Sequence, residues 1–245
     1  GGQPGWADWV PRQAGAQIID VGGESTRPGA TVVSNDEERR RVIPVIEAIA
    51  GRDGTVIISI DTVHATIAGS ALDAGAAIIN DVTAGRHDPE LLGVAARRGA
   101  GIVLSHSRGP LGRLASYDHA TYFDLLGEVA SELGDAMARA SSAGIAEDAI
   151  VIDPGFGFGK TATQSLALLH QLDGVVALGR PVMVGLSRKR FLGEATGHDV
   201  GDRDRATAAA CALAYERGAR FFRVHAPAAV RDALAVAEAV ARAGQ

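Results

Sequence analysis

The chain is poor in the residues that mark several large classes of protein. It has a single cysteine, Cys211, among 245 residues, and only 4% of its residues are aromatic. One thiol provides neither a disulfide framework nor a cluster of cysteine metal ligands. Because Cys211 lies in an apolar run of helical character, we expect it to serve packing rather than chemistry.

An excess of positive charge and long apolar runs are also missing. Lys and Arg number 24 against 29 Asp and Glu, which gives a net charge of −5 and excludes the basic footprint of a general nucleic-acid binder. No apolar run reaches the roughly 18 residues that a membrane span requires. The first residues, Gly1 to Gly5, lack the basic and apolar regions of a signal peptide. We therefore predict a cytoplasmic enzyme with small-molecule substrates, without nucleic-acid or membrane partners.

Short runs rich in isoleucine and valine alternate with longer stretches of helical period, which is typical of parallel strands joined by helices. Seven strands are predicted: Ile18 to Val21, Val56 to Ile60, Ala77 to Val82, Gly101 to Ser105, Ala149 to Ile152, Pro181 to Leu186 and Phe221 to Val224. Most of them have no polar residue before their last positions, as expected of strands covered on both faces.

The number of strands decides between an open sheet and a barrel. Seven βα units exceed the five or six strands of the common open sheets, and polar residues end nearly every strand rather than two. A Gly-Ala pair precedes four of the strands, as a helix-ending turn would. Since no linker divides the chain, we predict one domain over residues 1–245 with an α/β fold, a (β/α)8 TIM-type barrel of which seven strands are visible.

In such a barrel the site lies at the carboxyl ends of the strands. Asp61 and Asp153 each follow an apolar strand, where a carboxylate can stabilise a developing cation, bind a ligand N–H group, or simply cap the next helix. Arg223 and His225 are two positions apart on one predicted strand, so both face the same side. They suit a phosphate or a carboxylate, although a structural ion pair explains them equally well when they are taken alone.

Two glycine-rich segments resemble nucleotide loops but have the wrong spacing. Residues 155–160 lack the spacing of a phosphate loop, and Gly22-Gly23 lacks that of a dinucleotide fold. We expect the glycines after Asp153 to form a tight turn in which Phe158 offers a flat apolar surface to an aromatic substrate. The basic run that begins at Ser187 follows a predicted strand, although such runs are usually solvated turns.

Six blocks in chain order, spanning residues 18 to 225, resemble the dihydropteroate synthase family of folate biosynthesis. They are Asp20 to Gly29 (DVGGESTRPG), Ser59 to Thr62 (SIDT), Ile79 to Val82 (INDV), Asp153 to Lys160 (DPGFGFGK), Gly185 to Phe191 (GLSRKRF) and Arg223 to His225 (RVH).

The resemblance implies a (β/α)8 barrel, commonly dimeric, that joins 6-hydroxymethyl-7,8-dihydropterin pyrophosphate to p-aminobenzoate in the presence of Mg2+. The products would be 7,8-dihydropteroate and pyrophosphate. By resemblance, the pterin is held by Asp61, Asn80, Asp153 and Lys189, of which Asp61, Asp153 and Lys189 are the catalytic candidates. Pyrophosphate is bound by Arg223 and His225, and p-aminobenzoate by Thr26, Arg27, Pro28, Phe158 and Ser187, with Lys189 nearby.

The chain departs from the family at its beginning. We do not find the family's first strand, nor the following loop whose asparagine binds magnesium pyrophosphate, so no metal ligand is predicted here. A helix around Trp6 to Gln13 also looks shortened. We expect a sequence record that begins after the first strand; the alternative is a paralogue that binds pterin with impaired catalysis. Ser105 and Ser107 replace methionines that usually surround His106, which predicts a more polar pocket wall beside a structural histidine.

A methyltetrahydrofolate-dependent methyltransferase would share the pterin-binding barrel. Thr26 to Gly29 and Ser187 to Lys189 argue against it, because the resemblance assigns them to p-aminobenzoate.

Overall fold

The computed structural model describes residues 15–24, 33–52 and 54–244. It contains the seven predicted strands: β1 (Ile18–Gly22), β2 (Ile57–Asp61), β3 (Ile78–Asp81), β4 (Gly101–Ser105), β5 (Ile150–Asp153), β6 (Met183–Val184) and β7 (Phe221–Phe222). The last two are shorter than predicted. The predicted helix around Trp6 to Gln13 lies outside the described residues.

All the strand pairs are parallel, and spatial order follows chain order. Strands β1 to β5 form one sheet in the order β1-β2-β3-β4-β5, and β6 pairs with β7. A bridge between Ile152 and Val182 joins β5 to the start of β6. Sequential parallel strands that curve round in this way form a (β/α)8-type barrel, as the sequence predicts. In the described residues, no ladder joins β7 to β1.

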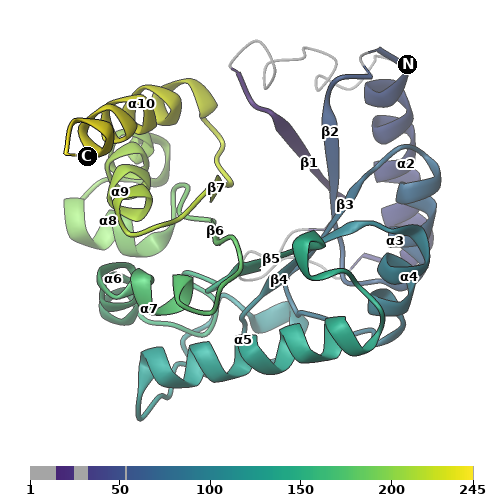
Figure 1. Ribbon diagram of the computed structural model, residues 1–245, viewed down its shortest axis with the longest axis horizontal. Coiled ribbons are helices and arrows are strands. Elements are labelled where there is room, and N and C mark those ends of the chain that lie inside the picture. The colour runs from purple at the N-terminus through teal and green to yellow at the C-terminus, as the bar shows by residue number, and fades with distance from the viewer. Residues whose placement is uncertain (1–14, 25–32, 53, 245) are drawn as a thin grey trace.

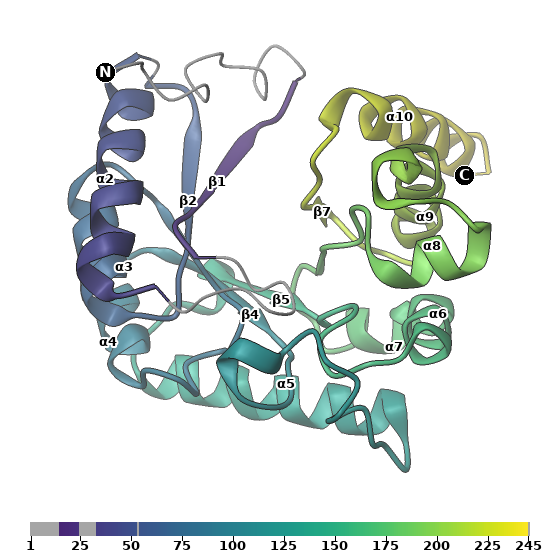
Figure 2. The same ribbon diagram turned by 180° about the vertical axis from the view of Figure 1, so that it is seen from behind.

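The helices surround the strands, as both views of the ribbon show (Figures 1 and 2). Their bounds are α2 (Asn35–Arg52), α3 (Ala65–Asp73), α4 (Glu90–Arg98), α5 (Leu125–Ser142), α6 (Ala162–His170), α7 (Leu172–Val176), α8 (Arg190–Thr196), α9 (Asp204–Glu216) and α10 (Pro227–Ala243). Short 3-10 turns cover Leu111–Arg113, Glu147–Ala149 and Val200–Asp202.

Helix α2 illustrates how local sequence sets an element of the outer layer. The backbone N–H of Glu37 donates to Ser34 Oγ at 3.3 Å. This bond satisfies one of the backbone N–H groups that have no acceptor within the helix in its first turn. Val42 and Ile46, one turn apart, are buried against the sheet. Burying each such side chain contributes about 1.5–3 kcal/mol, more than the isolated helix could supply. Pro44 lies inside the helix, as the sequence indicates.

Three of the four predicted Gly-Ala pairs follow helices of the described residues and end them. Gly75, Gly99 and Gly218 follow α3, α4 and α9 with φ angles of 115°, 60° and 98°. This region is costly for residues with a Cβ atom, so glycine stops each helix at the point where the chain turns into the next strand.

The core lies between the strands and the helices. In β4, Ile102, Val103 and Leu104 are all buried, which confirms that this strand is covered on both faces. Cys211 on α9 is fully buried, and burial raises the pKa of its thiol to about 12, so it serves packing. None of the helices in the described segments has both the length and the apolar composition needed to cross a membrane.

Candidate active site

Most of the predicted site residues lie at the carboxyl ends of neighbouring strands. Asp61 is the last residue of β2, Asn80 pairs with it from β3, and Asp153 is the last residue of β5. Ser187 and Lys189 follow β6. Because parallel strands end at the same edge, residues far apart in the chain meet at one end of the barrel.

The side chain of Arg223 connects the end of β7 to the ends of β1 and β2. Its Nε donates to Asp20 Oδ2 at 2.5 Å, and its terminal nitrogen donates to Asp61 Oδ2 at 2.6 Å. The Asn80 amide also donates to Asp20 Oδ2, at 3.0 Å. The Arg223 side chain is 46% exposed, against 17% for Asp20 and 14% for Asp61. The guanidinium therefore holds two carboxylates and still presents a surface to an anion.

Two acceptor atoms in this cluster have no hydrogen-bond partner in the part of the chain that the structure describes. They are Asp20 Oδ1 and Asn80 Oδ1, and both atoms are buried. A buried acceptor without a partner costs about 1–3 kcal/mol. A ligand that carries N–H groups would satisfy both atoms, so the cluster is chemically suited to a heterocycle with amino and ring N–H donors.

The carboxyl groups of Asp61 and Asp153 both have raised pKa values. Burial, reinforced by the negative charge of Asp20, raises the pKa of Asp61 to about 7 against the opposing effect of Arg223. Burial also raises the pKa of Asp153, although the backbone N–H of Gly155 donates to its Oδ1 at 2.8 Å and opposes the shift. Clusters of perturbed carboxyl groups are characteristic of functional sites.

The ammonium group of Lys189 lies against an aromatic ring. Its Nζ is 4.0 Å from the centroid of the Phe158 ring, within the range of a cation–π interaction. Burial lowers the pKa of Lys189 to about 8, and the charge of Asp153 opposes that shift. Phe158 itself is buried, so its ring and the Lys189 ammonium form part of one wall.

Ser187 and His225, which the sequence assigns to different subsites, are in contact. The Ser187 Oγ lies 2.8 Å from His225 Nδ1 and also accepts the backbone N–H of His225 at 3.1 Å. The pair lies close to the strand end that carries Arg223. Thr26, Arg27 and Pro28 lie outside the described residues.

The glycine-rich turn after β5 is held by a buried lysine. Lys160 donates to the carbonyl oxygens of Gly155 and Phe158, both at 3.1 Å, and lies 2.8 Å from His106 Nδ1. Burial lowers the pKa of Lys160 to about 7. His106 is buried too, and its Nε2 lies 3.1 Å from Glu132 Oε2. The structure thus places His106 in the scaffold that orients the turn, in keeping with its expected structural role.

The sequence names one residue of the cluster, Asp20, as the start of the first block but gives it no binding role. Asp20 shares its carboxylate between Arg223 and Asn80. Its position near the end of an apolar strand, two residues before the last residue of β1, is the signal for such a role. By contrast, Asp81 accepts the backbone N–H groups of Thr83 and Gly85 at 2.7 and 2.5 Å, so its carboxylate is engaged in a turn.

The polar wall expected beside His106 is partly engaged within the protein. The Ser107 hydroxyl donates to the Val82 carbonyl oxygen at 2.6 Å and accepts from the Arg86 guanidinium at 2.7 Å. Ser105 is buried at the end of β4. Ser107 therefore joins the β3 and β4 ends rather than only adding a polar surface.

A separate group has the residue types of a metal site. Glu24, Glu38 and His64 each have a ligand-type atom within 4.8 Å of the others. Among the described residues, this is the group of histidine and carboxylate side chains close enough to hold an ion. It shares no member with the cluster around Arg223.

Comparison with known proteins gives a consistent result. Residues 10–225 match the family described as pterin binding enzyme. The chain is 44% identical to the dihydropteroate synthase of Bacillus subtilis over 86% of the chain and 70% of that protein. It is 47% identical, again over 86% of its length, to a probable bifunctional folylpolyglutamate synthase/dihydropteroate synthase of Haloferax volcanii, but spans only 25% of that protein.

A solved structure shows the same fold. The chain superposes on the dihydropteroate synthase of Xanthomonas albilineans, determined with 4-aminobenzoic acid, with a TM-score of 0.87 and 43% identity. The match covers 94% of this chain and 81% of that one.

Proposed function

The chain belongs to the pterin binding enzyme family, and on that premise we propose that it is a dihydropteroate synthase. It would join 6-hydroxymethyl-7,8-dihydropterin pyrophosphate to p-aminobenzoate and release 7,8-dihydropteroate and pyrophosphate. The observation that carries the proposal is the pair of buried acceptors Asp20 Oδ1 and Asn80 Oδ1, which have no hydrogen-bond partner in the described segments, beside an exposed guanidinium. Together they complement an N–H-rich ring that bears an anion.

The pterin would be held by Asp61, Asn80, Asp153 and Lys189. The ring presents an amino group, a ring N–H and a carbonyl oxygen, which match carboxylate, amide and ammonium partners in that order. The raised pKa values of Asp61 and Asp153 reflect the cost of keeping these carboxylates ionised without a ligand. Pterin N–H groups offset part of that cost, so the site favours this heterocycle over an apolar one.

The reaction replaces a C–O bond with a C–N bond at the pterin methylene. The leaving oxygen takes the electron pair of the C–O bond, and Arg223 and His225 stabilise the departing pyrophosphate. Carboxylates of Asp61 and Asp153 stabilise the positive charge that develops on the pterin methylene. The aniline nitrogen of p-aminobenzoate then forms the new bond and loses one proton to solvent.

For p-aminobenzoate we propose the side of the site formed by Phe158, Ser187 and Lys189. Phe158 would provide an apolar contact for the benzene ring, and Lys189 lies against the Phe158 ring. Thr26, Arg27 and Pro28, implied by the family resemblance, complete the proposed site.

Mg2+ belongs to the proposal as a companion of pyrophosphate rather than a resident ion. The carboxylates nearest Arg223, those of Asp20 and Asp61, already accept from its guanidinium, and Ser187 pairs with His225. This donor set fits an anion and does not form a cage for a hard cation, which prefers oxygen ligands and keeps several waters. The phosphate oxygens would supply its ligands.

The test is turnover of the two substrates with Mg2+, followed by the appearance of 7,8-dihydropteroate and pyrophosphate. We expect product from the unaltered chain and a loss of at least about 100-fold in kcat/KM for Lys189→Ala and for Asp153→Ala, since each removes a charged partner of the reacting ring. Cys211→Ala, in the core of the outer layer, is the control and should retain activity. Pterin binding by calorimetry without any product would instead identify a non-catalytic paralogue.

We also propose a homodimer and a cytoplasmic location. Three apolar side chains on the adjacent helices α9 and α10, Leu213, Val236 and Val240, are 50%, 65% and 61% exposed, which suits a surface covered by a second copy. The one cysteine of the chain, Cys211, is a buried free thiol, which a reducing compartment would keep reduced.

A further inference from the structure

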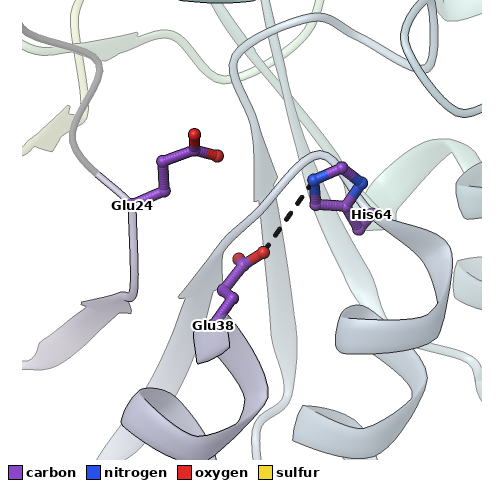
Figure 3. Close-up of side chains that lie close together, drawn as sticks. All are labelled: Glu24, Glu38 and His64. Carbon is purple, nitrogen blue, oxygen red and sulfur yellow. Dashed lines mark ion pairs between the residues drawn. The ribbon is translucent and has the colours of Figure 1, made fainter. Parts of the chain in front are cut away.

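Glu24, Glu38 and His64 meet where three elements of the barrel's first part converge. Glu24 follows β1, Glu38 lies in the first turn of α2, and His64 immediately precedes α3 (Figure 3). Their ligand-type atoms all lie within 4.8 Å of one another. In Figure 3 the Glu38 carboxylate points toward the imidazole of His64. The Glu24 side chain extends from the end of β1 toward the side on which His64 lies.

The backbone is shaped so that these side chains can approach. A Cβ atom at Gly23 would lie 2.8 Å from Glu38 Cγ and 3.0 Å from Val42 Cγ1, so only glycine lets the end of β1 come this close to α2. Glu24 is thereby brought to the buried face of that helix. His64 makes no side-chain capping bond at the start of α3, so its ring is not used by the helix.

The carboxylate of Glu38 is the second, independent sign of a ligand. Glu38 is 1% exposed, yet its Oε2 has no hydrogen-bond partner among the described residues and lies 4.0 Å from His64 Nε2. Arg41, one turn further along, pairs with Glu37 and with the Gly23 carbonyl oxygen rather than with Glu38. Burial raises the pKa of Glu38, as expected of a carboxylate whose charge is poorly compensated.

We propose that Glu24, Glu38 and His64 bind a divalent transition-metal cation of the Zn2+ class. Two carboxylate oxygens and one imidazole nitrogen form a three-ligand set that leaves a position for water, and the two negative charges balance the ion. The imidazole favours Zn2+ over Mg2+ or Ca2+, which prefer oxygen ligands alone.

The geometry allows the ligands to close around such an ion. Metal–ligand distances of about 2.0–2.2 Å place neighbouring ligand atoms roughly 3.3–3.5 Å apart in a tetrahedron. The separation of 4.0 Å between Glu38 Oε2 and His64 Nε2 must therefore shorten by about half an ångström. Glu24 and His64 are only partly buried, so their side chains can make that adjustment.

The test is a calorimetric titration of the tag-free full chain, stripped with a chelator, with ZnCl2 in phosphate-free buffer. We expect one saturable site per chain that persists in excess Mg2+. His64→Ala and Glu38→Gln should each weaken binding by about 100-fold or more, beyond the 10- to 100-fold typical of groups outside the ligand set. His87→Ala is the matched control. The His87 ring packs edge-on against the His64 ring, with 5.2 Å between the ring centroids, but His87 is not one of the three proposed ligands.

X-ray absorption of the zinc-loaded chain supplies the second readout. We expect one nitrogen and at least two oxygen ligands at about 2.0–2.2 Å. Glu24→Gln keeps the test decisive if Glu38→Gln does not fold, as judged by circular dichroism. Absence of a saturable site in the folded chain, or equal affinity in His64→Ala, would overturn the proposal. Turnover is not the readout, so either result leaves the proposed synthase reaction to its own test.

Discussion

Burial and ion pairing act in opposite directions on the carboxyl group of Asp61. Its pKa of about 7 lies above the ordinary value because burial and Asp20 outweigh Arg223. If the ionised form holds the pterin, kcat/KM for the pterin substrate should fall as the pH drops below about 7, because kcat/KM reports groups of the free enzyme. Asp61→Asn should be less active and lose this pH dependence.

A pH–rate profile on both proteins checks this expectation. A wild-type kcat/KM that stays constant from about pH 8 to 6, across the expected titration, would contradict it.

His106 makes a prediction about stability rather than activity. Burial lowers its pKa from 6.5 to about 4, although Glu132 opposes the shift. Between these two values the unfolded chain binds a proton that the folded chain does not, so acidification favours unfolding. The stability present above pH 6.5 is lost as the pH falls toward 4, by about 3 kcal/mol in total.

Urea denaturation of wild type and His106→Gln between about pH 6.5 and 4.5 measures this contribution, because Glu132, whose pKa His106 also lowers, titrates mainly below that interval. We expect the wild type to lose more stability than the variant over the same acid interval. Parallel pH curves would show that His106 is not buried in its neutral form.

At the scale of an element, the turn after β5 contains three glycines with positive φ, of which Gly155 has the closest backbone contact. Gly155 has a φ of 69°, and a Cβ there would lie 1.8 Å from the carbonyl oxygen of His106. Gly179 has a similar φ of 78°, but a Cβ would meet nothing within 4 Å. Gly155→Ala should therefore cost more than about 4 kcal/mol, whereas Gly179→Ala should cost only the backbone strain of about 1–2 kcal/mol.

Denaturant midpoints of the two variants measure this difference. Equal losses of stability would mean that the turn can shift away from β4 and that the contact with His106 does not fix it.

The strands show how well the local sequence predicts the position and length of each element. Apolar runs predicted all seven strands, and β2 to β5 begin and end within two residues of the expected positions. The predicted strand Pro181 to Leu186 is longer than β6, which keeps only Met183–Val184. The length of a strand depends on how far its partner runs alongside it. Strand β6 pairs with β7, almost 40 residues further along the chain, so the local sequence of β6 does not fix where the pairing ends.

At the scale of the whole molecule, the exposed apolar surface of α9 and α10 predicts an interface between two copies. Val236 and Val240 are one turn apart on α10 and so share a face, and Leu213 is exposed on the adjacent helix α9. The double variant Val236→Glu/Val240→Glu should convert a dimer to a monomer, because carboxylates on both sides of a two-fold interface repel and lose their hydration.

Light scattering after size-exclusion chromatography measures this change. Leu166→Glu on α6, which replaces a side chain that is 43% exposed, is the matched control and should leave the mass unchanged. A wild-type chain that is monomeric at all concentrations would contradict the proposed dimer.

The sequence by itself determined the parallel α/β barrel and the end of it that carries the site, because both follow from local patterns: apolar strands, glycine turns and polar residues at strand ends. It also determined the family, since six blocks carry the resemblance. Only the tertiary structure decided which side chains meet. Arg223 contacts Asp20 and Asp61 across 203 and 162 residues.

The tertiary structure also decided two contacts between residues that belong to different sequence motifs or to none. The contact of Ser187 with His225 and the approach of Glu38 to His64 depend on how the strands curve and on the one glycine that brings β1 against α2. Sequence spacing specifies which strand a residue ends, but not the distance between two strand ends. That distance is set by packing of the whole barrel, and so are the burial and the pKa values that follow from it.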